Sequence, residues 1–69
     1  MEIQTSYIKL DSFLKMTGAV GTGGEAKIRI TGGEVRVNGE TEVRRGRKLY
    51  PGDRVSLGAE EFVVTGEQP

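Results

Sequence analysis

The feature that most restricts the fold is the stretch EVRVNGETEV, residues 34–43, in which apolar and polar residues alternate around Asn38-Gly39. Asn-Gly is the dipeptide that best tolerates the positive φ angles of a type I′ turn. We therefore predict a β-hairpin in which Val35 and Val37 face the same side of the sheet. A short antiparallel sheet must then form part of the fold.

A second hairpin is predicted in the C-terminal third of the chain. The sequence YPGD, residues 50–53, places Pro and Gly at the central positions of a type II turn. Strand-forming residues then occupy 54–57 and 61–65, with a connection near Gly58-Ala59. The sheet should therefore hold at least two consecutive hairpins.

A helix is expected after residue 10. A short strand in residues 2–10 precedes it, because the β-forming Ile3, Thr5 and Tyr7 alternate there. Asp11 or Ser12 could cap the helix by accepting a hydrogen bond from an N–H of the first turn. Residues at helical spacing would form one buried stripe, namely Leu10, Phe13, Leu14 and Thr17. Gly18 is expected to end the helix.

The segment after the glycine-rich loop has two interpretations. Strict alternation in residues 26–31 favours a strand. A helix is favoured instead by Thr22 and Glu25, which have the spacing of a capping box in which Glu25 bonds back to the N–H of Thr22. Gly32-Gly33 would then stop the helix. The residues alone leave both interpretations open.

The order strand, helix, loop, helix and four strands predicts an α+β domain, with two helices on one face of a small antiparallel sheet of about four to five short strands.

With 69 residues the chain is expected to be a single domain, residues 1–69, with a frayed tail at about 66–69. The first twenty residues are charged and contain no apolar run of signal-peptide or membrane-span length. We therefore expect a free-standing cytoplasmic protein with no membrane partner.

The composition argues against catalysis. The chain has no Cys and no His, which removes thiolate metal ligands and the usual general base. The carboxylates that could be considered for catalysis are better explained as helix caps or as a solvated turn, and they are Asp11, Glu25, Glu60 and Glu61. The stretch GTGGEA, residues 21–26, matches a dinucleotide fingerprint only superficially, because no buried strand precedes it. We expect no enzyme activity, cofactor or metal.

Net charge is zero but unevenly distributed. Residues 27–54 hold eight basic and four acidic side chains, +4, whereas residues 1–26 carry −1 and residues 55–69 carry −3. Four of the basic residues fall within five positions, Arg44, Arg45, Arg47 and Lys48, and we call them the basic run. The guanidinium group binds phosphate in a bidentate manner, so the basic run favours an anionic partner such as nucleic acid. A solvated loop and an acidic protein partner remain as alternatives.

Three stretches together resemble a known family. IKLDSFLK, then GGEAKIRITGGEVRVNGE, then RRGRKLYPGD are similar to the αL RNA-binding domain named for ribosomal small-subunit protein four, in its free-standing bacterial branch of YaaA-like and YbcJ-like proteins. The resemblance covers residue 7 to about residue 57. It implies that residues 23–30 are helical, so that two helices form an αL motif packed on the sheet.

The resemblance also implies a function. In this family the two helices and the neighbouring hairpin form a positive surface that docks on structured RNA, commonly ribosomal RNA, and the small branch is linked to large-subunit assembly. Larger members commonly have Ser-Arg where this chain has Thr22-Gly23, which shifts a larger share of phosphate contacts to the basic run. Charge and resemblance together predict an RNA-contacting set of Lys9, Asp11, Lys15, Thr22, Gly23, Lys27, Arg29, Asn38, Arg44, Arg45, Arg47 and Lys48.

We therefore expect a non-catalytic, monomeric RNA-binding protein that recognises the shape and phosphates of folded RNA, ribosomal RNA ahead of transfer RNA. A narrow A-form major groove hides the base edges, and the chain has no Trp and few other aromatic residues. Tyr50 is expected in turn or core packing rather than in stacking on bases. The rival hypothesis is a protein-interaction module that binds an acidic surface of a ribosomal or replication-associated partner.

Overall fold

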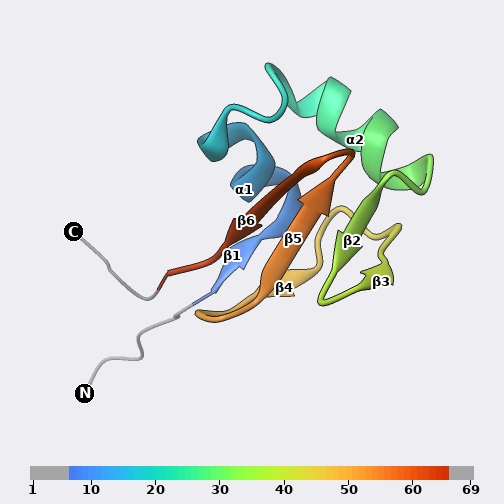
Figure 1. The fold of residues 1–69 in the computed structure, drawn as a ribbon. Helices are drawn as coiled ribbons and strands as arrows, with labels where there is room; N and C mark the ends of the chain where they lie inside the picture. The colour runs from blue at the N-terminus through green and yellow to red at the C-terminus, as the bar shows by residue number, and fades with distance from the viewer. Residues whose placement is uncertain (1–6, 66–69) are drawn as a thin grey trace.

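The computed structural model describes residues 7–65 (Figure 1). In chain order its elements are β1 (Ile8–Lys9), α1 (Leu10–Thr17), α2 (Gly23–Thr31), β2 (Val35–Val37), β3 (Glu40–Thr41), β4 (Lys48–Leu49), β5 (Arg54–Leu57) and β6 (Glu60–Val63). The predicted strand in residues 2–10 is seen only at its end, because Ile3 and Thr5 lie outside the described residues, as does the expected frayed tail.

The described strands form two antiparallel sheets. The larger sheet has the order β3-β2-β5-β6, and the smaller pairs β1 with β4. Figure 1 shows the two helices on one side of the larger sheet. The α+β class is confirmed, and so is the packing of two helices on small antiparallel sheets. The two-residue strand β4 was not predicted, and its pairing with β1 divides the strands between two sheets instead of one.

Both predicted hairpins are confirmed. Asn38 has φ 54° and Gly39 has φ 87°, as a type I′ turn requires, and β2 pairs with β3 across them. Gly52 has φ 97°, and the N–H of Asp53 donates to the carbonyl oxygen of Tyr50 at 3.0 Å, which closes the predicted turn. Strand β6 begins at Glu60, one residue before the predicted start.

Helix α1 buries Leu10, Phe13 and Leu14 of the predicted stripe, whereas Thr17 is half-buried and the predicted cap is not formed. Its N-terminal flanking residue is Lys9, and no side chain caps the helix there. The carboxylate of Asp11 accepts only from the adjacent N–H of Ser12, at 2.7 Å. The prediction that Asp11 or Ser12 is the cap was therefore wrong, because backbone groups from a distant segment take that role. Gly18 ends the helix as predicted, in the left-handed conformation with φ 84°.

The segment after the glycine loop is helix α2, so the strand interpretation was wrong. Thr22 Oγ1 accepts a hydrogen bond from the N–H of Glu25 at 3.1 Å, as predicted for a cap. The carboxylate of Glu25 bonds to the N–H of Gly21 at 3.0 Å rather than to that of Thr22, so the reciprocal part of the capping box was misplaced. The alternation misled because Ile30 is fully buried whereas Ile28 is 68% exposed.

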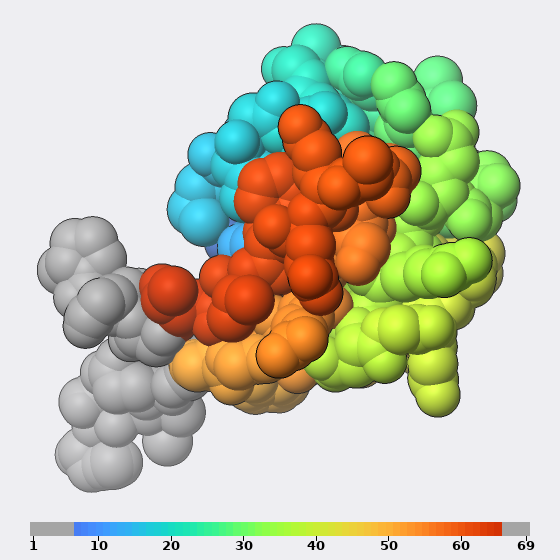
Figure 2. All heavy atoms as spheres, in the orientation of Figure 1, coloured from blue at the N-terminus to red at the C-terminus, as the bar shows by residue number. Residues whose placement is uncertain are grey.

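One hydrophobic cluster holds the helices and both sheets together. It consists of Leu10, Phe13, Leu14, Val20, Ala26, Ile30, Val35, Val37, Leu49, Val55, Leu57 and Val64. Leu49 of β4 is fully buried in it, which anchors the smaller sheet to the domain. Figure 2, in the same orientation as Figure 1, shows the C-terminal strands of the larger sheet across the middle of the molecule. The β2–β3 hairpin lies beside them.

Candidate nucleic-acid interface

The basic run forms a turn whose backbone is bonded to the start of α1. The carbonyl oxygen of Arg47 accepts a hydrogen bond from the N–H of Leu10 at 2.9 Å, and that of Arg45 accepts from the N–H of Asp11 at 3.2 Å. The first N–H groups of a helix have no partner within the helix. The basic run supplies these partners with its main chain, so its side chains are not used for capping.

Glu42 organises two of the arginines. It is the only charged residue among residues 7–65 that is buried, with 6% of its surface exposed. Its Oε2 accepts from Nε of Arg44 at 2.9 Å and its Oε1 accepts from Nη2 of Arg44 at 3.2 Å. The same Oε1 accepts from Nη1 of Arg47 at 2.7 Å. We call these three residues the Glu42 cluster.

The Glu42 cluster is ionised at every physiological pH. Hydrogen bonds from Arg44 and then Arg47 lower the pKa of the Glu42 carboxyl from 4.5 to about 2, although its burial acts in the opposite direction. The Arg44 side chain remains 73% exposed and that of Arg47 is 29% exposed. Arg44 therefore presents a guanidinium held in a fixed orientation at the surface, and Arg47 serves mainly to secure the turn.

A second pair of cations lies on the smaller sheet. Lys9 of β1 and Lys48 of β4 are directly opposite each other in the antiparallel register, and both are exposed. Like charges placed opposite each other destabilise a strand pair. Neither lysine, nor Arg45, forms an ion pair with another residue in the described part of the chain. These cations are therefore available to an external anion.

We define the basic surface as the five cations that the start of α1, the turn and the β1–β4 pair bring together, namely Lys9, Arg44, Arg45, Arg47 and Lys48. With Glu42 the unit carries +4 (five cations, one anion), and Asp11 at its border reduces this to +3. Such a concentration of charge attracts polyanions even on a chain of zero net charge.

Other predicted site residues lie on the two helices. Lys15 is exposed in the last turn of α1, and Lys27 is exposed on α2. Thr22 caps α2 and Gly23 is its first residue. The N–H of Gly21 at this helix start is already bonded to the carboxylate of Glu25. Within residues 7–65 no ion pair joins these residues to the basic surface.

Two predicted residues make internal contacts. Arg29 forms ion pairs with Glu34 at 2.9 Å and Glu25 at 3.5 Å, and the hydrogen bond that it donates to Glu34 contributes most to raising its pKa. Asn38 donates to the carboxylate of Asp53 at 3.2 Å and accepts from the N–H of Arg54 at 3.0 Å. Because these four contacts are internal, Arg29 offers less free charge, and Asn38 less free hydrogen-bonding capacity, than the residue types suggest.

The residue patterns did not indicate that Glu42 and Tyr7 would contact the predicted cations. Glu42 was counted only as one of the acids opposing the basic residues, because burial of a single charged residue has no local signal. Tyr7 was assigned only to a strand, yet the ammonium group of Lys48 lies 5.0 Å from the centre of its ring. The pairing of β1 with β4 that brings them together links residues about forty positions apart, and it follows only from the fold.

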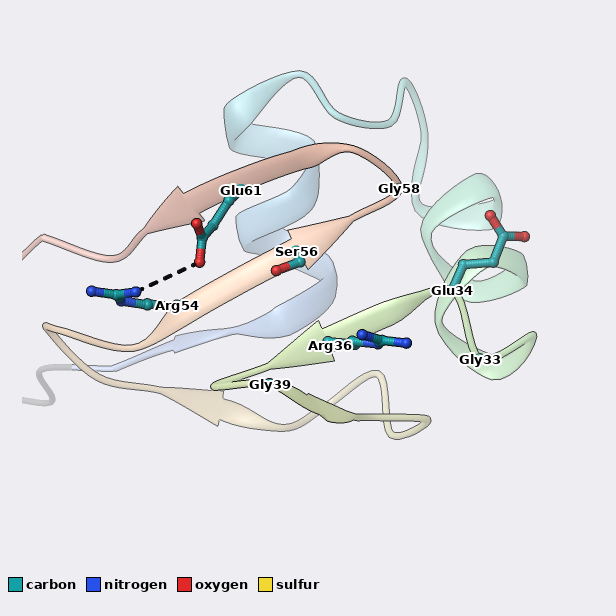
Figure 3. A pocket seen from close by; sticks show the side chains of 8 residues that line it. All are labelled: Gly33, Glu34, Arg36, Gly39, Arg54, Ser56, Gly58 and Glu61. Carbon is teal, nitrogen blue, oxygen red and sulfur yellow. Dashed lines mark ion pairs between the residues drawn. The ribbon is translucent and has the colours of Figure 1, made fainter.

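A shallow hollow of about 680 Å³ lies on the outer face of the larger sheet, and one end of it is lined by Gly33 and Glu34, which lie just after α2 (Figure 3). Its charged lining residues are of both signs, Glu34, Arg36, Arg54 and Glu61, and Arg54 pairs with Glu61 at 4.0 Å. These opposing charges make the hollow a weaker anion site than the basic surface.

Within residues 7–65 no helix is long and apolar enough to cross a membrane, and no three acidic side chains are grouped as metal ligands.

Comparison with known proteins identifies the family. A family model described as the S4 domain matches residues 1–65. The chain belongs to the S4 RNA-binding domain family. This S4 chain is 46% identical over 57 residues to a Bacillus subtilis protein named "Probable ribosome maturation protein RlbA", covering 83% of this chain and 80% of that protein. It is 34% identical over 58 residues to Escherichia coli "Putative RNA-binding protein YbcJ", covering 84% of this chain and 83% of the relative.

Membership confirms the resemblance seen in the sequence, and S4 domains are typically non-catalytic. In this S4 domain the second helix begins with Thr22-Gly23, so it has no arginine at its first position. The organised cations lie instead at the start of the first helix, in the Glu42 cluster and beside it.

Proposed function

We propose that the protein is a monomeric, non-catalytic cytoplasmic RNA-binding domain spanning residues 1–69. It docks on structured ribosomal RNA during assembly of the large ribosomal subunit, and the basic surface makes the main contacts. Lys15 and Lys27 add positive charge on the helices. The name of the Bacillus relative supports a role in ribosome maturation, and the S4 family supports RNA as the ligand.

The observation that carries the proposal is the fixed geometry of the basic surface. A solvated loop kept only for solubility would need neither a buried carboxylate nor main-chain bonds to a helix start. Here Glu42 orients Arg44 at 2.9 Å, and the carbonyls of Arg45 and Arg47 hold the turn on α1. Cations that are already positioned lose less conformational entropy when they bind a phosphate array. Such an array is what a folded RNA presents.

Binding should depend strongly on salt. Contact with about four phosphates releases counterions, which weakens binding by about a hundredfold between about 50 and 200 mM salt. The ligand is a structured ribosomal RNA fragment, and affinity is measured by filter binding across this range. A slope near zero in the plot of log affinity against log salt would contradict phosphate docking.

Arg45 supplies the sharper test because it forms no ion pair in the described part of the chain. We expect Arg45→Glu to weaken RNA binding by about tenfold and to reduce the salt slope by about one unit. The matched control is Arg36→Glu, which makes the same charge change at the hollow of the larger sheet. The control should stay within about twofold of the wild type, because Arg36 lines the hollow of the larger sheet and is not part of the basic surface.

Equal losses of RNA affinity in the two variants would show that net charge matters and the basic surface does not.

The effect of RNase on association with ribosomes offers a second test. Association that disappears after RNase treatment supports the proposal. Association that survives RNase would assign the basic surface to an acidic protein partner instead.

A further inference from the structure

The outward face of the β1–β4 pair combines two tyrosines with two lysines. Ile8 is opposite Leu49 and Lys9 is opposite Lys48, so continuing the ladder places Tyr7 opposite Tyr50. Side chains of a strand alternate between its faces. Leu49 is fully buried, so the other face carries Tyr7, Lys9, Lys48 and Tyr50, which we call the tyrosine–lysine patch.

The geometry agrees with this assignment. The ring centres of Tyr7 and Tyr50 lie 6.1 Å apart at an interplanar angle of 54°. The ammonium nitrogen of Lys48 lies 5.0 Å from the ring centre of Tyr7. Tyr50 is 49% exposed, so it is not part of the core, although it begins the predicted turn. Tyr7 is therefore held by its neighbours, while much of Tyr50 faces solvent.

Fold stability does not account for the whole patch. A tyrosine pair stabilises a two-stranded ladder modestly, but two lysines opposite each other oppose that effect. The hydrogen bonds of the Tyr50 backbone, to the carboxylate and the N–H of Asp53, do not involve its ring. A half-exposed aromatic ring beside two unpaired cations is the combination that binds single-stranded nucleic acid, with rings for the bases and cations for the backbone.

We propose that the tyrosine–lysine patch binds an unpaired nucleotide of the RNA. Its base stacks on Tyr50, and Lys9 and Lys48 contact the phosphates on either side of it. The patch continues directly into the basic surface, which shares both lysines, so one RNA could engage a folded region on the turn and an unpaired nucleotide on the patch. This inference rests on the proposed RNA-binding function and adds recognition of unpaired bases to it.

The fluorescence of the two tyrosines can be used to test this proposal. It has two tyrosines and no tryptophan, so all tyrosine emission comes from the patch. Two RNAs with the same stem are compared, one with a loop of unpaired uridines and one closed as a blunt duplex. Because stacking places a base against the ring, the looped RNA should quench tyrosine emission and the blunt duplex should leave it nearly unchanged.

Variants then separate stacking from charge. Tyr50→Ala should bind the looped RNA about tenfold more weakly, since stacking on an aromatic side chain contributes on that order per base, and should bind the duplex like the wild type. Tyr50→Phe keeps the ring and should retain both affinities. Ile28→Ala, which trims another exposed apolar side chain on α2, serves as the control. Circular dichroism on heating checks that each variant is folded.

The outcomes distinguish this inference from the proposed function. If Tyr50→Ala binds both RNAs like the wild type, or loses both equally, base stacking on the patch is refuted. In that case Arg45→Glu can still lose affinity for both RNAs, which leaves the proposed function standing. If the wild type binds neither RNA, the proposed function fails and the stacking inference fails with it.

Discussion

Replacing Glu42 with Gln tests the central structural claim about the basic surface. Gln has nearly the same shape as Glu but no charge, so Glu42→Gln removes the ion pairs to Arg44 and Arg47 without leaving a cavity. It also turns an NH₂ group of the amide towards one of the guanidinium groups. We expect the variant to be folded but measurably less stable at neutral pH.

The size of the effect follows from the pKa of Glu42. The folded state lowers that pKa from 4.5 to about 2, and each unit corresponds to about 1.4 kcal/mol, which gives an upper value between about 3 and 4 kcal/mol. Arg44 is 73% exposed, and solvent weakens its attraction to the carboxylate. We therefore expect Glu42→Gln to lower the free energy of unfolding by about 2 kcal/mol at pH 7.

The direction of the pKa shift determines how the stabilising effect of Glu42 changes with pH. Because the pKa of Glu42 is lower in the folded state, its stabilising effect is fully present above pH 4.5 and is lost as the pH falls through about 2. The wild-type protein should therefore lose its advantage over Glu42→Gln between these two values. Below pH 2 both proteins carry a neutral group at position 42 and should have similar stability.

Urea unfolding followed by circular dichroism, at several pH values from 7 to 2, measures this difference. Glu40→Gln is the control, since Glu40 is exposed and forms no ion pair in the described residues. The remaining carboxylates are common to all three proteins, so their effects cancel in the comparison. A difference that is absent at pH 7, or that persists unchanged at pH 2, would refute the role assigned to the carboxylate.

Three further predictions use simpler variants. Ile30→Ala should destabilise the domain by about 2–5 kcal/mol, whereas Ile28→Ala should change its stability by less than about 0.5 kcal/mol; similar values from urea unfolding would contradict the helical assignment of α2. Thr22→Ala should cost about 1 kcal/mol in the same assay, because it removes the cap hydrogen bond to Glu25. Glu42→Gln should weaken RNA binding by about threefold or more although it adds positive charge, because the arginines are no longer positioned; tighter binding in a filter assay would mean that charge alone decides affinity.

Local signals determined which parts of the fold could be predicted. The hairpin at Asn38-Gly39 follows from two adjacent residues that tolerate positive φ. Helix α2 was harder, because its alternating residues satisfy the strand period. The cap at Thr22 and the stop at Gly32 outweighed the alternation, and the buried side of the helix formed around Ala26 and Ile30.

The residues of the candidate site could be predicted from the sequence, but the contacts that position them could not. The sequence predicts that the basic run binds an anion, because its cationic residues are close together in the chain. The cap of α1 could not be predicted, since it comes from the carbonyls of Arg45 and Arg47. Nor could the strand pair that places Lys9 opposite Lys48. Both depend on contacts between residues more than thirty positions apart, which residue patterns do not reveal.

These long-range contacts also explain how a chain of zero net charge can bind a polyanion. If the basic run were an isolated flexible loop, its charges would sample many positions and their attraction would be averaged. Bonding the turn to the start of α1 places it beside Lys9, and the Glu42 cluster costs one unit of positive charge while fixing two guanidinium groups. Apart from Glu42 and Asp11, the acidic residues include Glu60 and Glu61 on β6, outside the basic surface. We therefore expect the distribution of charge in the fold, rather than its sum, to determine the affinity for RNA.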